Sequence, residues 1–399
     1  MPTLYESHSR HAKYYLEVLK SANHIYKQGG EAAEQALSVF DLEWRNILAG
    51  QAWAEEQASN DPSAAEYCND YPKDAWDLLD LRQHLSERRS WVEAALSASR
   101  LLRDRVSEAG HVGHLGQISV YSFNVPQAIS FLEQSLAINR EIGNRAGEGA
   151  ALGVLGQAYA LIGEISRSIM CGTQALIVYR ETRNRRGEAW TLNDLGNAYA
   201  YTRKTQDSIE SYEKALTAFR EIGDRRGEAS VLINLGATYQ DCGEIYYASE
   251  LYEQALIVIR ELHDPRGEFG VLNNLGAVHM EIGSMERAIG LYERALVIAR
   301  EVEDKRGEGV VLGNLGNVYA ELGNMHRAIE FHIQSLIVAR ETGDRRSEGY
   351  SFLNMSLVFK KLGELTQAVT YAEAALGVFE QIGDPLATVA RERIKALAE

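Results

Sequence analysis

The sequence predicts an all-α protein, a right-handed superhelical solenoid built from helix-turn-helix hairpins. The main observation is a forty-residue segment that recurs in register, with copies beginning at 185–188, 225–228, 265–268 and 305–308. Each copy continues with Leu-x-x-Leu-Gly, and these motifs end at Gly196, Gly236, Gly276 and Gly316. Self-similarity at a fixed period of about 20–50 residues indicates a repeat array. Only six prolines occur in 399 residues, which suits long helices.

Length, charge and cysteine content narrow the class of protein. Each unit of a solenoid packs only on its neighbours, so 399 residues fit one continuous stack. The formal net charge of −15 argues against nucleic acid or an anionic membrane as the main partner. Three scattered cysteines do not make a disulfide framework or a zinc site. The sequence contains neither a secretory signal nor the ~18 consecutive apolar residues of a membrane span, so we expect a soluble, cytoplasmic protein.

One repeat, residues 224–263, shows how each hairpin is specified. Asp224 is a favourable N-cap residue, so the first helix should start near residue 225. Gly243 should end that helix, and the second helix should run from about Ile245 to Leu262. Apolar residues at helical spacing then face the core: Leu232, Leu235 and Tyr239 on the first helix, and Ala248, Tyr252, Ala255, Leu256 and Ile259 on the second. No hairpin buries its apolar face alone, so the hairpins must stack.

These residues resemble the tetratricopeptide repeat. The pattern of that family is matched here by Leu272, Leu275-Gly276, His279, Gly283, Ala288, Tyr292 and Ala295. The usual unit has 34 residues, and the longer unit here is similar to the forty-residue repeats of Leu-Gly-Asn-type spindle-orientation scaffolds and their bacterial relatives. The resemblance implies that one side of each first helix lines a concave groove.

We expect three segments along the chain. Residues 1–64 form an N-terminal helical segment, residues 65–384 form the array, and residues 385–399 form a C-terminal capping helix. Within the array, 65–144 are degenerate repeats and 145–384 are six regular repeats. Residues 1–64 resemble the segment that joins the ATPase module to the repeats in bacterial STAND or NB-ARC-type signalling ATPases, in which the repeats act as a sensor. No phosphate-binding Gly-x-x-x-x-Gly-Lys-Ser/Thr loop is present, so the chain is either a fragment or a free-standing protein.

A column of amides lies on the predicted groove side of the first helices. Because asparagine has poor helix propensity, its repeated use in mid-helix needs a reason. An amide carries both donors and an acceptor, which suits the backbone of an extended peptide. The alternative is that each side chain bonds to the neighbouring repeat and fixes the stacking. The candidate peptide-binding residues are Asp194, Asn234, Asn274, Asn314 and Asn354, with Asn197 and Asn317 beside them.

A column of arginines occupies the first turn of the same helices. Guanidinium groups favour carboxylate partners, so this column predicts an acidic peptide. The alternatives are that the glutamates two residues further along pair with these arginines between repeats, or that both sets are simply solvated charges. The column comprises Arg186, Arg226, Arg266, Arg306 and Arg346.

These patterns favour a scaffold or sensor that binds a protein or peptide, with no catalytic residues, metal or cofactor. The histidines form no metal-ligand motif, and we interpret His114, which stands in the asparagine column, as repeat degeneracy. One alternative is a small-molecule sensor with an aromatic pocket, for which Trp190, Tyr201 and Tyr350 are the candidates. Another is a structural subunit held by its convex face or its ends. The sequence sets neither the identity of the partner nor the oligomeric state.

Overall fold

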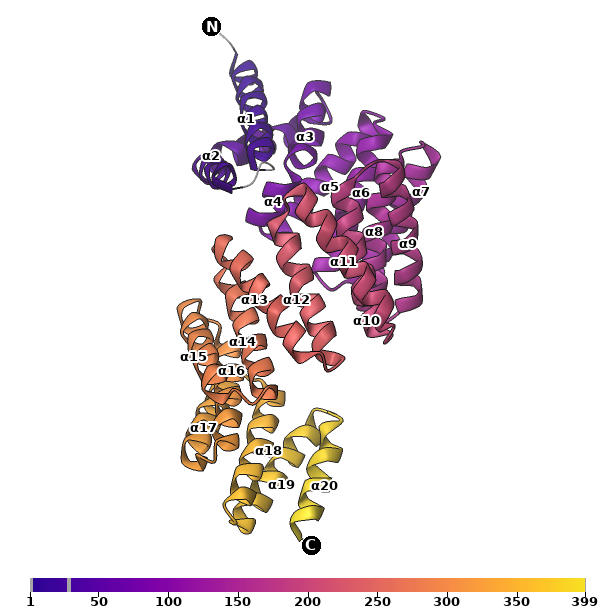
Figure 1. Ribbon diagram of the computed structural model, residues 1–399. Helices are drawn as coiled ribbons and strands as arrows, with labels where there is room; N and C mark the ends of the chain where they lie inside the picture. The colour runs from indigo at the N-terminus through magenta and orange to yellow at the C-terminus, as the bar shows by residue number, and fades with distance from the viewer. Residues whose placement is uncertain (1–2, 27–29, 399) are drawn as a thin grey trace. The chain divides into compact units, whose positions relative to one another are not determined.

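The structure, a computed structural model, describes residues 3–26 and 30–398. These residues form twenty α-helices and no strand, so the all-α prediction is confirmed (Figure 1). The chain divides into two compact units, Met1–Ala218 and Phe219–Glu399, and the boundary falls inside α11 (Thr205–Ile222). Each unit is described by itself below.

The N-terminal unit contains long helices followed by hairpins of nearly constant length. Its first helices are α1 (Leu4–Tyr26), α2 (Gly30–Gln57), α3 (Pro62–Asp74), α4 (Trp76–Arg82) and α5 (Leu85–Leu101). The hairpins that follow are built from α6 (Arg105–Tyr121), α7 (Val125–Glu141), α8 (Arg145–Leu161), α9 (Ile165–Glu181) and α10 (Arg185–Tyr201).

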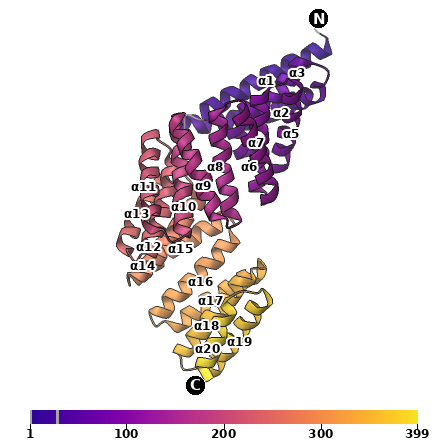
Figure 2. The same ribbon diagram turned by 90° about the vertical axis from the view of Figure 1, so that its right-hand side faces the viewer.

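The C-terminal unit continues the same alternation of first and second helices. It comprises α12 (Arg225–Asp241), α13 (Ile245–Glu261), α14 (Pro265–Glu281), α15 (Met285–Glu301), α16 (Lys305–Glu321), α17 (Met325–Glu341), α18 (Arg345–Lys361), α19 (Leu365–Gln381) and α20 (Leu386–Ala398). Figure 2 gives a second view, in which consecutive helices again lie side by side within this unit.

The α12–α13 hairpin shows why the sequence folds in this way. The side chain of Asp224 accepts a hydrogen bond of 3.0 Å from the backbone N–H of Gly227, which caps α12. Gly243 turns the chain with φ +82°, a conformation that glycine adopts without strain. Leu232 and Tyr252 are 0% and 1% exposed, so the two helices bury their apolar faces against each other. The boundaries of both helices agree with those predicted to within one residue.

The helices before the hairpins share a separate core. Leu19, Ile47 and Leu78 are fully buried in it, and Trp44 stacks on Trp91 with 5.6 Å between ring centroids. The hydroxyl of Tyr71 donates a hydrogen bond of 2.8 Å to the carbonyl of Ala12, which ties α3 to α1. In the part of the chain that the structure describes, no helix has the length and apolar character needed to span a membrane.

Candidate functional site

In the C-terminal unit, the face of the first helices that the resemblance predicts to line a groove carries polar side chains. On α12, Arg226, Ala237 and Asp241 are exposed and Asn234 is half-buried. The opposite side of the same helix is buried through Leu232 and Leu235. Two faces of one helix therefore have different environments, and the polar face is available for contacts outside the hairpin.

The asparagine column is half-buried at every position in the C-terminal unit. At one position the structure shows a contact between repeats, because Asn314 donates its Nδ2–H to Oδ1 of Asn273 over 2.9 Å. An amide has two donor hydrogens and an acceptor oxygen, so this one bond leaves a donor hydrogen and the oxygen of Asn314 for other contacts. Stacking and ligand binding are therefore compatible in one side chain. The members of the column are Asn234, Asn274, Asn314 and Asn354, and Asn317 is also half-buried.

Asp194, which takes the same column position in the N-terminal unit, has a distinct environment. Its Oδ2 accepts a hydrogen bond of 2.8 Å from Nε2 of Gln157 on the preceding first helix. Burial raises the pKa of Asp194 to about 6, although hydrogen bonds from Gln157 and Asn193 act in the opposite direction. The carboxyl lines a cavity of about 370 Å³ together with Asn197 and Tyr201. Asn197 is exposed, and its Oδ1 accepts a 2.6 Å hydrogen bond from the hydroxyl of Tyr212.

Replacing Asp194 with asparagine should stabilise the protein at neutral pH. The folded-state pKa is above the unfolded value, so between about pH 4 and 6 the unfolded chain ionises first and folding loses stability. The amide of the variant has no charge to desolvate, and its oxygen still accepts from Gln157. We expect the variant to exceed the original by about 1–3 kcal/mol above about pH 6.5 and to match it below about pH 4, since one pKa unit corresponds to about 1.4 kcal/mol. Urea unfolding across this pH range measures the difference, and a constant difference at every pH would contradict the assigned burial.

The arginine column has partners that the sequence did not indicate. In the C-terminal unit, Nε of Arg306 lies 3.0 Å from Asp344 and Nε of Arg346 lies 2.9 Å from Asp384. Both aspartates cap the next first helix along the chain. The alternative given above, pairing with the glutamate two residues away, does not occur at these two positions, because Glu308 and Glu348 pair with other cations. Arg186, Arg226 and Arg266 are exposed on their helices.

In most repeats the glutamate instead joins two cations on either side of the turn between hairpins; Glu268 differs, because Pro265 replaces the second cation and the glutamate pairs with Arg260 and Arg294. Glu308 accepts hydrogen bonds from Arg300 at 2.7 Å and from Lys305 at 2.8 Å. Glu188 does the same with Arg180 at 2.8 Å and Arg185 at 2.6 Å. The sequence contains a pattern that could have predicted this ion-pair arrangement. An arginine stands eight residues before each glutamate and recurs every forty residues: Arg140, Arg180, Arg220, Arg260, Arg300 and Arg340.

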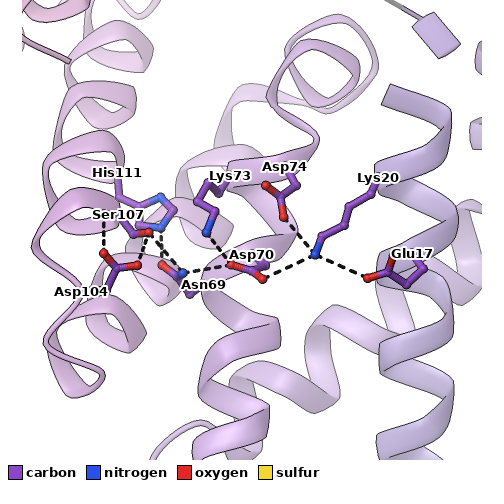
Figure 3. A network of polar contacts seen from close by, with 9 residues as sticks. All are labelled: Glu17, Lys20, Asn69, Asp70, Lys73, Asp74, Asp104, Ser107 and His111. Carbon is purple, nitrogen blue, oxygen red and sulfur yellow. Dashed lines mark hydrogen bonds and ion pairs between the residues drawn. The ribbon is translucent and has the colours of Figure 1, made fainter. Parts of the chain in front are cut away.

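An aromatic cluster lies within residues 65–144, the segment for which the sequence predicted degenerate repeats. The rings of Trp76 and His114 stack with centroids 3.8 Å apart and an interplanar angle of 3°. The nearby His111 lies in a polar network that reaches Lys20 on α1 through α3, as Figure 3 shows. Among the aromatic residues that the sequence suggested, Tyr201 lines the cavity beside Asp194, and Tyr350 packs edge-on against Phe379 with 5.9 Å between centroids.

A family profile described as tetratricopeptide repeat matches residues 227–301, 268–325 and 307–381, and a second of the same description matches residues 189–222. These residues are tetratricopeptide repeats. The resemblance stated from the Leu-Gly motifs is thereby confirmed. None of the curated proteins matches the sequence significantly.

Several solved structures share the fold over most of the chain. A signal transduction ATPase with numerous domains and a tetratricopeptide repeat sensor, from Pyrococcus horikoshii, is 15% identical with a TM-score of 0.66, over 89% of this chain and 55% of that one. The apo quorum sensor NprR from B. thuringiensis is 12% identical with a TM-score of 0.62, over 92% and 98% of the two chains. A Rap protein complexed with Competence and Sporulation Factor is 14% identical with a TM-score of 0.56, over 89% and 99%. Identities this low establish the fold alone.

Proposed function

We propose that the chain binds an extended segment of a protein partner along the polar face of its first helices, without catalysing a reaction. The observation that carries this proposal is the asparagine column at forty-residue spacing, half-buried on that face in the C-terminal unit. Asn314 keeps a donor and an acceptor beyond its contact with Asn273. Four amides at regular spacing present donors and acceptors to the N–H and C=O groups of an extended backbone.

The strength of such binding comes from repetition. One neutral hydrogen bond contributes about 0.5–1.5 kcal/mol net, so a single asparagine has little effect on affinity. Four such contacts together hold a peptide in one register. Half-burial adds to this, because a side chain that is already partly ordered loses less freedom when a ligand binds.

The exposed arginines favour an acidic segment. Arg306 and Arg346 are engaged with the caps of the following helices, whereas Arg226 and Arg266 have no ion pair within the described residues. Their guanidinium groups suit a carboxylate of the ligand. We place the acidic residues of the ligand beside α12 and α14 for this reason.

The similar structures support a role in sensing. They include a quorum sensor and the sensor-bearing signalling ATPase. A cytoplasmic signalling protein that recognises a peptide or protein is the function we propose on these grounds.

A triple replacement of Asn234, Asn274 and Asn314 by alanine tests the proposal. The expected result is loss of the partner that the original protein captures from a lysate of its source organism, with a melting temperature within a few degrees of the original. Alanine is a better helix former than asparagine, so the helices themselves should not weaken. Affinity capture with mass spectrometry, together with calorimetry of each variant, measures both quantities.

The matched control replaces Gln254, Arg294 and Gln334 by alanine, which changes one exposed side chain on each second helix of the same repeats. It should leave capture intact. Equal capture by the asparagine variant would place the partner elsewhere, and a large loss of melting temperature would assign the column to stacking.

A further inference from the structure

A cavity of about 480 Å³ lies within the N-terminal unit. Residues of α6, α7 and α8 line it, together with Lys73 from α3 and Trp76 from α4. Its size falls in the range of about 300–1,000 Å³ that is usual for small-ligand sites. No aspartate or glutamate is among the lining residues, although the chain as a whole is acidic.

The cavity exists because small residues occupy the lining face of two first helices, α6 and α8. A Cβ atom added at Gly110 would meet nothing within 4 Å. Gly110, Gly113 and Ala150 all line the cavity. Two repeats after Gly110 and Gly113 the same columns hold Trp190 and Asn193, which are large enough to fill such a space. The cavity therefore depends on small residues at particular positions of the sequence.

Trp76 and His114 line the cavity and belong to a larger aromatic cluster. The guanidinium of Arg88 lies 5.2 Å from the ring centroid of Trp76 and 5.8 Å from that of Tyr121. Trp76 stacks in turn on His114, which lines the cavity. Arg88 is only 2% exposed, and its ion pair with Asp80 fixes the guanidinium beside the ring of Trp76. A planar group inside the cavity would extend an arrangement that already has three aromatic rings and a guanidinium.

A buried hydrogen-bond acceptor lies in the same lining. His111 is 1% exposed, and its Nε2 lies 2.9 Å from Oδ1 of Asn69, as Figure 3 shows. Because that oxygen only accepts, the hydrogen of the imidazole is on Nε2 and the lone pair is on Nδ1. Burial lowers the pKa of His111 to about 4, so the ring is neutral at physiological pH. No described residue donates to Nδ1, which is fully buried.

Two other polar side chains of the lining are satisfied within the protein. Ser135 donates to the carbonyl of Ala109 over 2.8 Å, and Asn139 accepts from Nδ2 of Asn144 over 2.8 Å. Nδ1 of His111 and Nδ1 of His114 are buried lining atoms to which no described residue forms a hydrogen bond. Of these two, Nδ1 of His111 has its lone pair fixed by the bond at Nε2, so it is the acceptor for which a bound molecule would supply the missing donor. A buried acceptor without a donor is unfavourable, so a ligand that brings one gains affinity.

We propose that this cavity binds a planar aromatic group that carries an N–H or O–H donor, stacked beside His114 and hydrogen-bonded to His111. The group can belong to a free small molecule of the indole or phenol type, or to a tryptophan or tyrosine side chain of a bound peptide. The site does not depend on the four asparagines of the C-terminal unit.

Titration of the full chain followed by ¹⁹F NMR tests the proposal with three probes. 5-Fluoroindole represents the free molecule, and acetyl-Gly-(5-fluorotryptophan)-Gly-amide represents the peptide side chain. 5-Fluoro-1-methylindole has the same ring without the N–H donor. We expect 5-fluoroindole or the tripeptide to bind, and methylation of the ring nitrogen to weaken binding about tenfold. The tighter of the two donor-bearing probes identifies the source of the ring.

Two leucine variants at the same repeat column provide the structural control. Gly110→Leu extends a side chain into the cavity and should abolish binding while the protein stays folded, because leucine is a better helix former than glycine. Gly270→Leu changes the equivalent residue of α14, where an added Cβ also meets nothing, and should leave binding unchanged. His114→Asn, which restores the residue type of later repeats, should weaken binding by removing the stacked ring.

Absence of binding by both donor-bearing probes would overturn the proposal. So would binding that survives in Gly110→Leu, or equal affinities for the indole and its N-methyl derivative. None of these results affects the peptide face of the C-terminal unit, which the asparagine variants test separately.

Discussion

Replacing Gly276 with alanine is expected to destabilise the C-terminal unit by about 2–3 kcal/mol, because the core there has no room for a methyl group. A Cβ atom at this position would lie 2.5 Å from the ring of Tyr292. Tyr292 is 1% exposed, so a shift of its ring disturbs the surrounding core. The glycine of the Leu-Gly motif therefore allows the first and second helices of a hairpin to approach closely. Urea unfolding of the variant and the original protein measures the change.

Gly270 on the same helix supplies the control. An added Cβ there meets nothing within 4 Å, so Gly270→Ala should stabilise the unit by about 0.5–1 kcal/mol through helix propensity alone. Changes of opposite sign in the free energy of unfolding at these two glycines of α14 would separate the effect of core packing from that of helix propensity. Similar changes at both positions would show that Tyr292 repacks without cost.

Replacing Glu308 with alanine should cost about 1–3 kcal/mol at neutral pH, because it removes two charge-assisted hydrogen bonds from a buried carboxylate. Glu308 is 6% exposed and joins Arg300, at the end of α15, to Lys305, at the start of α16. Both cations are more than half exposed and can return to water, so the loss stays below that of a fully buried pair.

The pH dependence distinguishes this electrostatic role from packing. Burial raises the pKa of Glu308, but the hydrogen bonds from Lys305 and Arg300 outweigh it, and the net pKa lies below the usual value. A lowered folded-state pKa contributes stability above the unfolded value of about 4.5, and this stability is lost as the pH falls through the folded value. The difference between Glu308→Ala and the original should therefore shrink in acid. Glu330→Ala, on an exposed part of α17, should change stability by less than about 0.5 kcal/mol at any pH. A cost for Glu308→Ala that persists in acid would assign the residue to packing.

The hairpins were predictable because their signals are local and repeated. Asp224 caps α12 and Gly243 ends it through hydrogen bonds and dihedral angles that depend on a few adjacent residues. The apolar positions of α13 follow from helical spacing, and Tyr252 is buried as expected. Six comparable copies of the same pattern made the period visible in a single sequence.

The partners of polar residues were less predictable because they depend on geometry between elements. Helical projection places the Arg306 column correctly on the first turn, but it does not show the ion pair with Asp344, which lies 38 positions along the chain. The interpretation of His114 as degeneracy rests on the loss of asparagine from that column. Its stack on Trp76 joins residues from a segment without a clear repeat pattern, so no period could indicate it.

In the proposed function, the partner contacts the polar face of the first helices. Site-specific photo-crosslinking tests this directly, with benzoylphenylalanine introduced at Ala237, which is exposed on that face of α12, or at Ile257, which is 59% exposed on α13. The same captured partner is used for both positions. We expect a crosslink from position 237 that is lost in the Asn234, Asn274 and Asn314 triple variant, and none from position 257. A crosslink from position 257 alone would contradict the proposed function and place the partner on the second helices.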